Sequence, residues 1–541
     1  MLGLMQNWPL LVSKILTHAE INHPKREVIS MQPEGGQVRM TWGDVARRSR
    51  QCAEALAKLG VKQGDRVATL AWNTNRHVEA WYASSGMGAV NHTINPRLFP
   101  EQIVYIANHA EDKVLMFDIT FLPLVEKLAP MMKSIEHYII MVGPEHMPQT
   151  SLPNVHSYEA LLAAEPGTFE WPELDENTAC GLCYTSGTTG HPKGVLYSHR
   201  SNFLHTLVCL STDTLKISAV STVLPVVPMF HANAWAIPYA TAAAGSKLVL
   251  NGPHHDPETL HKLIKDEGIT VTAAVPTIWN GMLAYIKANN LDMKPLELVT
   301  IGGSAVPRSM IETFQKDYGV RVNHAWGMTE MSPLGSVGSE NGAIMDLSAE
   351  EKLDYQVRQG RPPIGVELCI KDDDGNMLPR DGKTAGRLMA RGPWVIDSYY
   401  RADETALDDG GWFDTGDVAA LDPASYIQIT DRSKDVIKSG GEWISSIDLE
   451  NEAVAHPDVT EAAVIGVRHP KWEERPLMII TVKEGKTVSR DNMLEFLDSR
   501  CAKWWLPDDV VTVDSIPHTA TGKISKKDLR EQFKDYQLPT A

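Results

Sequence analysis

The stretch YTSGTTGHPKGV, Tyr184–Val195, decides how the rest of the chain is interpreted. Six small residues precede Lys193, namely Thr185, Ser186, Gly187, Thr188, Thr189 and Gly190. Glycines let backbone N–H groups approach an anion, hydroxyl groups donate further hydrogen bonds, and the lysine adds a positive charge. A Walker A loop has Gly before the lysine and Ser or Thr after it, whereas Pro192 and Gly194 stand here. We therefore expect a phosphate-binding loop of another kind; the alternative is a flexible surface loop.

Short β-rich runs alternate with helical patterns on the N-terminal side of this loop. DRVATLAW (Asp65–Trp72) and KVLMFD (Lys113–Asp118) predict strands. His77–Met87 and Leu122–Met132 carry apolar residues at helical spacing. This alternation predicts an α/β fold of parallel sheets covered by helices, with ligands at the carboxyl ends of the strands.

The chain after residue 431 has a different pattern. Thr460–Val467 and Leu477–Gly485 predict strands, and Arg490–Trp505 predicts a helix. Ser525–Phe533 begins with a capping-box pattern, Ser525 with Asp528 three residues later. The charged stretch Asp431–Lys434 predicts a boundary between domains 1–431 and 432–541, although an ordinary surface turn would look the same.

Length and charge narrow the class of protein. The 541 residues exceed what one hydrophobic core usually supports, so two or more domains are expected. The net charge of −17 argues against binding to nucleic acid, which depends on neutralising phosphates. It does not exclude an anionic nucleotide, because a local cradle can oppose the global sign.

The cysteines and the apolar segments indicate in which cellular compartment the protein is expected. The six cysteines are sparse and suggest no disulfide framework; Cys180 and Cys183 form a C-x-x-C without a second pair, which favours strand residues over a redox or zinc site. The N-terminus lacks the features of a signal peptide, and the apolar segment Ala234–Gly245 is too short to span a bilayer. We expect a cytoplasmic protein without an integral membrane segment.

Four later motifs accompany the loop. They are WGMTEMSP (Trp326–Pro333), GWFDTGD (Gly411–Asp417), DRSKDVIKSGGEWIS (Asp431–Ser445) and PHTATGKISKKDLR (Pro517–Arg530). Together and in this order they resemble the signature of the acyl-adenylate-forming enzymes, which include acyl-CoA synthetases, peptide-synthetase adenylation domains and firefly luciferase. The resemblance extends from Trp42 to Lys527. It implies a large N-terminal domain of layered α/β sheets with a β-barrel-like subdomain, then a small mobile α+β domain.

The resemblance also implies a reaction in two halves, with ATP, Mg²⁺ and CoA. A carboxylate attacks the α-phosphate of ATP to give acyl-AMP, and a thiol then displaces AMP. The implied ATP- and AMP-binding residues are Thr185, Ser186, Gly187, Thr188, Thr189, Gly190, Lys193, Gly302, Gly303, Ser304, Ala305, His324, Ala325, Trp326, Gly327, Met328, Thr329, Asp417 and Arg432. Thr185 and Glu330 are the implied magnesium ligands.

Roles in catalysis and in CoA binding come from the same resemblance. Lys523 would stabilise the attacking carboxylate and the α-phosphate, with Thr329 and Glu330 beside it, whereas Lys526 and Lys527 read as a solvated basic face. Lys434 would be the hinge about which the small domain rotates. The implied CoA-binding residues are Ser439, Gly440, Gly441, Glu442 and Trp443.

The acyl pocket is expected along PMFHANAWAIPYATAAAG (Pro228–Gly245). Its candidate wall is His231, Ala232, Trp235, Gly302, Pro333 and Leu334. No acidic residue lies between Phe230 and Gly245, and an unpaired buried ammonium is costly, so an amino acid is disfavoured. The overall pattern is similar to that of ligases acting on 3-(methylthio)propionate and on fatty acids. Trp235 could fill the pocket and restrict it to short acids, or it could act as a gate to a longer channel.

Three other activities stay open from the sequence. They are a luciferase-like oxidase, a protein that binds acyl-adenylate without catalysis, and a ligase that loads a carrier protein. The resemblance also suggests a homodimer.

Overall fold

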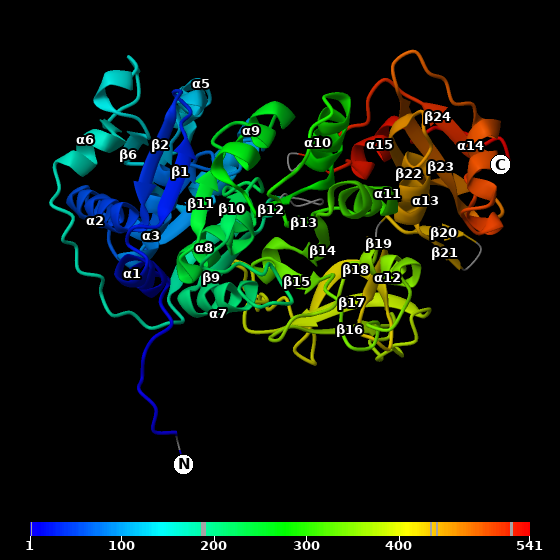
Figure 1. The fold of residues 1–541 in the computed structure, drawn as a ribbon, viewed down its shortest axis with the longest axis horizontal. Helices are drawn as coiled ribbons and strands as arrows, with labels where there is room; N and C mark the ends of the chain where they lie inside the picture. The colour runs from blue at the N-terminus through cyan, green and yellow to red at the C-terminus, as the bar shows by residue number, and fades with distance from the viewer. Residues whose placement is uncertain (2, 186–190, 433–434, 440–441, 520–522) are drawn as a thin grey trace. The chain divides into compact units, whose positions relative to one another are not determined.

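A computed structural model gives the structure of residues 1–541 except residues 2, 186–190, 433–434, 440–441 and 520–522 (Figure 1). The chain forms two compact units. Unit 1 comprises Met1–Thr300, Gly327–Leu334 and Pro393–Ala406, and unit 2 comprises Ile301–Trp326, Gly335–Gly392 and Leu407–Ala541. The domain boundary expected after residue 431 lies within unit 2 and stays a prediction.

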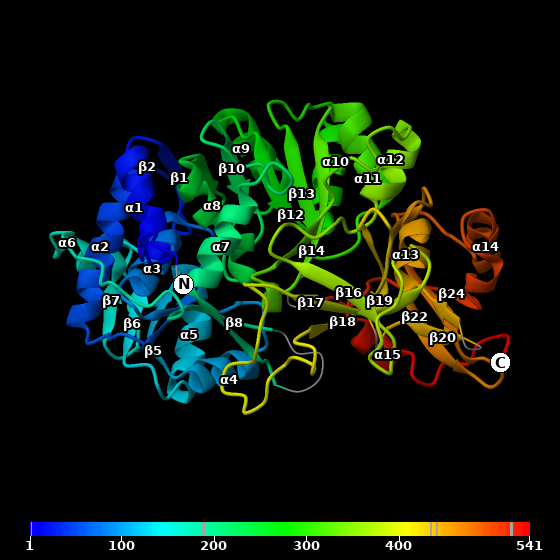
Figure 2. The ribbon, with the colours of Figure 1, turned by 90° about the horizontal axis from the view of Figure 1, so that it is seen from below.

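A seven-stranded sheet in unit 1 carries the stretch Tyr184–Val195. Its strand order is β7-β6-β5-β3-β4-β8-β9. Figure 2 labels β5, β6, β7 and β8 among these strands. All neighbours are parallel except β8 and β9, which form an antiparallel pair. The strands are β3 Arg66–Leu70, β4 Val90–Thr93, β5 Asp112–Phe117, β6 His137–Ile140, β7 Val155–Ser157, β8 Ala179–Tyr184 and β9 Gly194–Ser198. The predicted strands before the loop are thus confirmed as β3 and β5.

A second sheet in unit 1 has the strand order β12-β10-β11-β1-β2. Its neighbours are parallel except for β1 and β2. The strands are β1 Glu27–Met31, β2 Gln37–Thr41, β10 Thr222–Pro225, β11 Lys247–Leu250 and β12 Val271–Ala274. The α/β class is therefore confirmed.

The helices of unit 1 follow the predicted alternation. They are α1 Val12–Asn22, α2 Trp42–Lys58, α3 Asn75–Gly86, α4 Pro100–Ala110, α5 Leu122–Leu128, α6 Tyr158–Ala163, α7 His199–Cys209, α8 Ile237–Ala244, α9 Pro257–Glu267 and α10 Pro276–Ala288. Every residue of α3 is buried. The helix expected to reach Met132 ends at Leu128 and is followed by a 3₁₀ turn over Ala129–Met131, because Pro130 has no N–H to donate to the α-helix.

Unit 2 begins within β13 Leu298–Gly302 and includes β14 Arg321–Gly327 up to Trp326 and β15 Leu334–Val337 from Gly335. Two helices, α11 Arg308–Glu312 and α12 Ala349–Gln356, also belong to it. An antiparallel sheet has the order β16-β17-β18-β19 and corresponds to the expected barrel-like subdomain. Its strands are β16 Glu367–Lys371, β17 Ala385–Arg391, β18 Phe413–Leu421 and β19 Ile427–Arg432.

The C-terminal part of unit 2 is a sheet buried on both faces. Its strands are β20 Ile437–Ser439, β21 Glu442–Ile444, β22 Val459–His469, β23 Glu473–Val482 and β24 Asp509–Thr512. Ala462 and Val464 of β22 pack in one core with α13 Ser446–Val454 and α14 Arg490–Asp498. Ala463 and Ile465 pack in another core with Leu529 of α15 Lys526–Gln532. The period of two in a strand thus explains why this sequence is apolar almost without interruption.

Two local predictions for this part were wrong. The helix expected to reach Trp505 ends at Asp498, and the carbonyl groups of Trp504 and Leu506 accept hydrogen bonds from Arg475 instead of helical partners. Ser525 precedes α15 as expected, but no capping box forms. Its hydroxyl donates to the Asp528 carboxylate at 2.6 Å and is not used to accept from the backbone.

No helix among the described residues is long and apolar enough to cross a membrane. All six cysteines are free thiols. Cys180 and Cys183 lie in strand β8, as expected, and both are fully buried.

Candidate active site

The base of the predicted phosphate loop is held by backbone contacts. Thr185 N donates to Lys193 O at 2.9 Å, and Tyr184 pairs with Gly194 across β8 and β9. A Cβ atom on Gly194 would lie 3.1 Å from the Tyr400 Cβ atom and 3.2 Å from Leu182 Cδ1, so glycine is needed where β9 begins. Within residues 192–194, the lysine therefore supplies charge and the glycine allows close packing where β9 begins.

Lys193 and Glu330 both contact the side chain of Tyr399. The Lys193 ammonium lies 4.7 Å from the centre of the Tyr399 ring. The Tyr399 hydroxyl donates to Glu330 Oε1 at 2.9 Å. Unit 1 thus brings two of the predicted ATP-site groups, one cation and one carboxylate, to opposite parts of one aromatic side chain.

Thr329 and Glu330 follow β14 in a short 3₁₀ turn, and both are buried. Tyr197 of β9 donates its hydroxyl to Thr329 O at 2.7 Å, and Ile396 N donates to Glu330 O at 2.8 Å. Met328 N bonds to Pro333 O at 3.1 Å and closes the loop that carries both residues.

The predicted acyl-pocket segment contains a left-handed turn. Ala232, Asn233, Ala234, Trp235 and Ala236 have φ angles of 43°, 51°, 46°, 56° and 58°. Left-handed backbone costs an L-residue roughly 1–2 kcal/mol, so surrounding contacts must hold the turn. Cys183 donates to Asn233 Oδ1 at 3.4 Å, and Cys209 Sγ lies 3.9 Å from Trp235 O. His231 precedes the turn, and Ala234 N bonds back to His231 O at 3.2 Å.

Leu334 is another predicted pocket residue, and both its backbone N–H and its carbonyl form hydrogen bonds with side chains. Its N–H donates to His205 Nε2 at 3.2 Å, and its carbonyl accepts from Trp394 Nε1 at 2.9 Å. Burial lowers the pKa of His205 to about 3, so the imidazole is neutral and can accept. His205 and Cys209 stand one turn apart on α7, so one helix supports both Leu334 and the Trp235 turn.

In unit 2, Asp417 is a buried carboxylate with a partner on each oxygen. Trp326 Nε1 donates to Oδ2 at 2.8 Å, and Arg432 Nε lies 2.7 Å from Oδ1. Asp417 and Arg432 face each other across β18 and β19. The structure therefore brings together three of the predicted nucleotide-binding residues.

The other predicted adenine residues of unit 2 stand at strand ends. β13 ends at Gly302, Gly303 has a φ of 90°, and Ser304 and Ala305 follow. His324 and Ala325 lie in β14, and His324 Nδ1 contacts Val357 O at 3.1 Å. Burial lowers the pKa of His324 to about 4, so the ring is neutral. Gly327, the last residue of β14, belongs to unit 1.

The backbone of Lys523 forms two hydrogen bonds with Thr519. Thr519 N bonds to Lys523 O at 2.6 Å, and Lys523 N bonds back to Thr519 Oγ1 at 3.2 Å. Ser439, predicted to bind CoA, is buried in β20, and its hydroxyl accepts from Arg475 at 3.3 Å. Glu442 and Trp443 pair with Ser439 and Lys438 across β20 and β21.

The expectation that Lys526 lies on a solvated basic face was wrong. Its ammonium lies 2.9 Å from Glu450 Oε1 and 3.9 Å from Asp431 Oδ1, and it donates to the Ser446 hydroxyl. These groups pair because a buried ammonium needs carboxylate partners. Lys527, the next residue, is exposed as expected.

Several predicted residues lie outside the described part of the chain. They are Ser186, Gly187, Thr188, Thr189, Gly190, Lys434, Gly440 and Gly441. Among the described residues no group of three or more His, Cys, Asp or Glu side chains could hold a metal ion. Thr185 and Glu330 are only two of the oxygen donors that Mg²⁺ takes, and ATP phosphates and water usually supply the rest.

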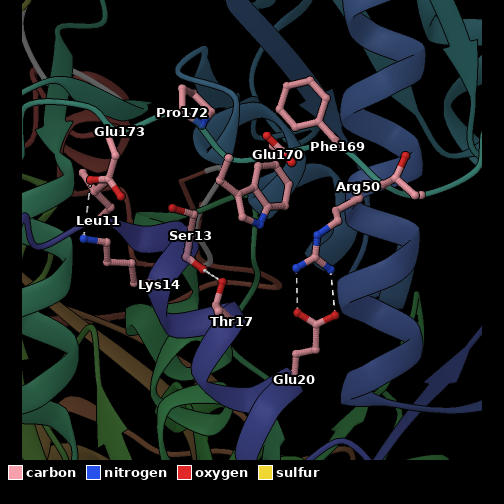
Figure 3. Close-up of a pocket in the computed structure, with 13 residues that line it drawn as sticks. Leu11, Ser13, Lys14, Thr17, Glu20, Arg50, Phe169, Glu170, Pro172 and Glu173 are labelled. Atoms are coloured by element: carbon pink, nitrogen blue, oxygen red, sulfur yellow. Dashed lines mark hydrogen bonds and ion pairs between the residues drawn. The ribbon is translucent and has the colours of Figure 1, made fainter.

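A cavity of about 530 Å³ lies elsewhere on unit 1 (Figure 3). Its lining includes Lys14, Thr17 and the ion pair between Arg50 and Glu20. None of the predicted site residues lines it.

Sequence reasoning missed the residues that hold the site. Tyr399 and Trp394 stand in a segment, Pro393–Ala406, that was not interpreted, and His205 and Arg475 carry no motif of their own. The aromatic pair in SYYRADE was the available signal for Tyr399.

These features define an enzyme that binds a nucleotide, and the family comparisons agree. A model of the AMP-binding enzyme family matches residues 16–400, and a model of the AMP-binding enzyme C-terminal domain matches residues 448–523. The chain belongs to the AMP-binding enzyme family, so the resemblance stated from the motifs is confirmed.

Individual relatives agree over nearly the whole chain. The 3-methylmercaptopropionyl-CoA ligase of Ruegeria lacuscaerulensis is 52% identical over 99% of each chain. The medium-chain-fatty-acid–CoA ligase of Ectopseudomonas oleovorans is 47% identical over 99% of this chain and 98% of its own. The solved structure of the anthranilate CoA ligase AuaEII with anthranoyl-AMP is 25% identical, with a TM-score of 0.87, and the match covers 98% of this chain and 99% of that one.

Proposed function

We propose that this protein is an AMP-forming acid–thiol ligase. It converts 3-(methylthio)propionate, ATP and CoA to 3-(methylthio)propanoyl-CoA, AMP and diphosphate. The observation that carries the reaction class is the placement of Lys193 and Glu330 on one Tyr399 side chain, a cation for phosphates beside a carboxylate for a metal. The similarity to the Ruegeria ligase supports the substrate.

In the first half-reaction a carboxylate oxygen of the acid attacks the α-phosphorus of ATP, and diphosphate leaves. Lys193 and the loop residues would hold the β- and γ-phosphates, Thr329 the α-phosphate, and Asp417 with Arg432 the ribose hydroxyls. Lys523 would stabilise the charge that develops between the acid and the α-phosphate. In the second half-reaction the CoA thiol attacks the acyl carbonyl, loses its proton, and AMP leaves with its bonding electrons.

Mg²⁺ fits the oxygen donors of the proposed site. Glu330 is a buried carboxylate with Oε1 occupied by the Tyr399 hydroxyl, and Thr185 offers a second oxygen. When bound, the ion would neutralise phosphate charge. The chain's own part is to hold Glu330 in a fixed orientation.

The choice of acid rests on the apolar segment after Phe230. The Ala232–Ala236 turn and the helix α8 offer no acidic side chain to pair an ammonium. A thioether tail is apolar and flexible and suits a pocket lined by Trp235 and aliphatic groups. Medium-chain fatty acids are the second candidate, favoured by the 47% identity with the Ectopseudomonas ligase.

A panel of acids tests this proposal. AMP formation would be measured with Mg-ATP and CoA, and the thioesters identified by mass spectrometry, for 3-(methylthio)propionate, butyrate, hexanoate, octanoate, palmitate, benzoate and alanine. We expect the highest kcat/KM for the thioether acid. A preference for octanoate or palmitate would instead assign a fatty-acyl-CoA synthetase in which Trp235 gates a longer channel.

The same panel separates the other activities. AMP formation in the absence of oxygen would exclude an oxidase, and turnover would exclude a protein that only binds acyl-adenylate. Replacing CoA by a carrier protein would reveal a carrier-loading ligase. We further propose a cytoplasmic homodimer; the six free thiols support a reducing compartment, and sedimentation analysis would give the oligomeric state.

A further inference from the structure

The segment that carries Tyr399 is tied to both halves of the proposed ATP site in unit 1. Ile396 N donates to Glu330 O at 2.8 Å, and Tyr400 N donates to Gly194 O at 2.8 Å. Tyr399 stands between these two backbone contacts. Its side chain is therefore fixed relative to Glu330 on one side and to the end of the phosphate loop on the other.

The hydroxyl of Tyr399 donates a hydrogen bond to Glu330 Oε1 at 2.9 Å. A hydrogen bond to one oxygen of a carboxylate restricts its rotation. The Glu330 carboxylate is thus held in a fixed orientation relative to Tyr399.

The ring of Tyr399 has a separate role. The Lys193 ammonium lies 4.7 Å from the ring centre, within the range of a cation–π contact. Such a contact holds the charge near the Glu330 site without neutralising it through a salt bridge. Lys193 therefore remains available to a phosphate group.

We infer that Tyr399 is a positioning residue for the metal–diphosphate part of ATP: its hydroxyl orients Glu330 and its ring holds Lys193. This inference rests on the proposed function, because it assigns the ligand of that same site. It assigns Tyr399 no part in binding AMP or the acid.

Two substitutions separate the two contacts. Tyr399→Phe keeps the ring and removes the hydroxyl, whereas Tyr399→Leu removes both. Tyr400→Phe is the matched control, because it changes the neighbouring residue and leaves its backbone bond to Gly194 intact. Circular dichroism and thermal unfolding would check that each variant folds.

The readout is equilibrium binding to the full-length protein by calorimetry, with Mg²⁺–diphosphate and AMP as separate probes. We expect Tyr399→Phe to weaken Mg²⁺–diphosphate binding by about five- to tenfold, the effect of one typical hydrogen bond. Tyr399→Leu should weaken it by about a further three- to fivefold through the lost cation–π contact. AMP binding should change less than about twofold in every variant.

A second readout follows the metal directly. Mn²⁺ bound with diphosphate gives an electron paramagnetic resonance spectrum, which should broaden or lose amplitude in Tyr399→Phe and stay unchanged in Tyr400→Phe. Unchanged Mg²⁺–diphosphate binding in Tyr399→Phe, or an equal loss of AMP binding, would overturn the inference. If no acid supports AMP formation and the binding split is nevertheless found, the proposed reaction fails and the role of Tyr399 stands.

Discussion

The indole of Trp326 donates its N–H to Asp417 Oδ2 at 2.8 Å, while Arg432 lies at the other oxygen of the same carboxylate. The carboxylate is buried and held in one orientation from two sides. A ribose hydroxyl pair would therefore meet an acceptor that needs no reordering. This arrangement gives the indole nitrogen of Trp326 a role in orienting Asp417 in the proposed nucleotide site.

Trp326→Phe tests that arrangement, since it keeps an aromatic face and removes the N–H. We expect AMP binding to weaken by about three- to tenfold, because Asp417 loses one hydrogen bond. The affinity for Mg²⁺–diphosphate should be the same as in the unsubstituted protein. Trp412→Phe is the control, because Trp412 lies against Arg391 in the same unit. Equal AMP affinity in the two variants would count against a role for the indole nitrogen.

Lys523→Ala should separate the two half-reactions. The loss of an ammonium that stabilises the transition state of adenylation should lower the rate of acyl-AMP formation by about 100-fold or more. Thioester formation from preformed acyl-AMP should remain, and Lys527→Ala, at an exposed position, should behave as the parent. Pyrophosphate release at a near-parental rate in Lys523→Ala would refute the assignment.

Lys526→Met should destabilise unit 2. Without the ammonium, the Asp431 and Glu450 carboxylates would lie buried without their cation, which costs roughly 3–5 kcal/mol in comparable pairs. Urea denaturation would measure the loss. Lys527→Met is the matched control, with an expected change within about 0.5 kcal/mol. If both variants unfold at the same urea concentration, the buried cluster contributes nothing to stability.

Mild acid should destabilise the protein through its buried histidines. Burial lowers the pKa of His77, His199 and His324 to about 4 and that of His205 to about 3, below the value of about 6.5 in an unfolded chain. Below pH 6.5 the unfolded chain therefore binds more protons, and the free energy of unfolding falls by up to about 1.4 kcal/mol per pH unit for each histidine. The stability is present above pH 6.5 and is lost as the pH falls towards 4.

Urea midpoints measured between pH 7.5 and 5 would test this dependence. His205→Gln removes one titrating site, while an amide oxygen can still accept from Leu334 N–H, so the slope with pH should become shallower. An equal slope with pH in His205→Gln and in the unsubstituted protein would contradict the lowered pKa of His205.

The sequence was informative where chemistry depends on a local run of residues. The strands β3 and β5 and the helix α3 follow from apolar periodicity, and Lys193, Glu330 and Asp417 were named from motifs. Tyr399, His205 and Trp394 could not be found in this way, because their partners lie far along the chain. Lys526 and Lys527 look alike in sequence, and the helix phase of α15 alone decides which one is buried.

The five left-handed residues Ala232–Ala236 have a consequence for the order of folding. Within the segment only Asn233 tolerates this backbone readily, so the segment takes its shape once β8 and α7 supply Cys183 and Cys209 as supports. It should be among the last parts of unit 1 to become structured and among the first to open in native-state hydrogen exchange. A ligand that packs against Trp235 would complete the folding of this segment, so the affinity for the acid and the protection of these amides should rise together.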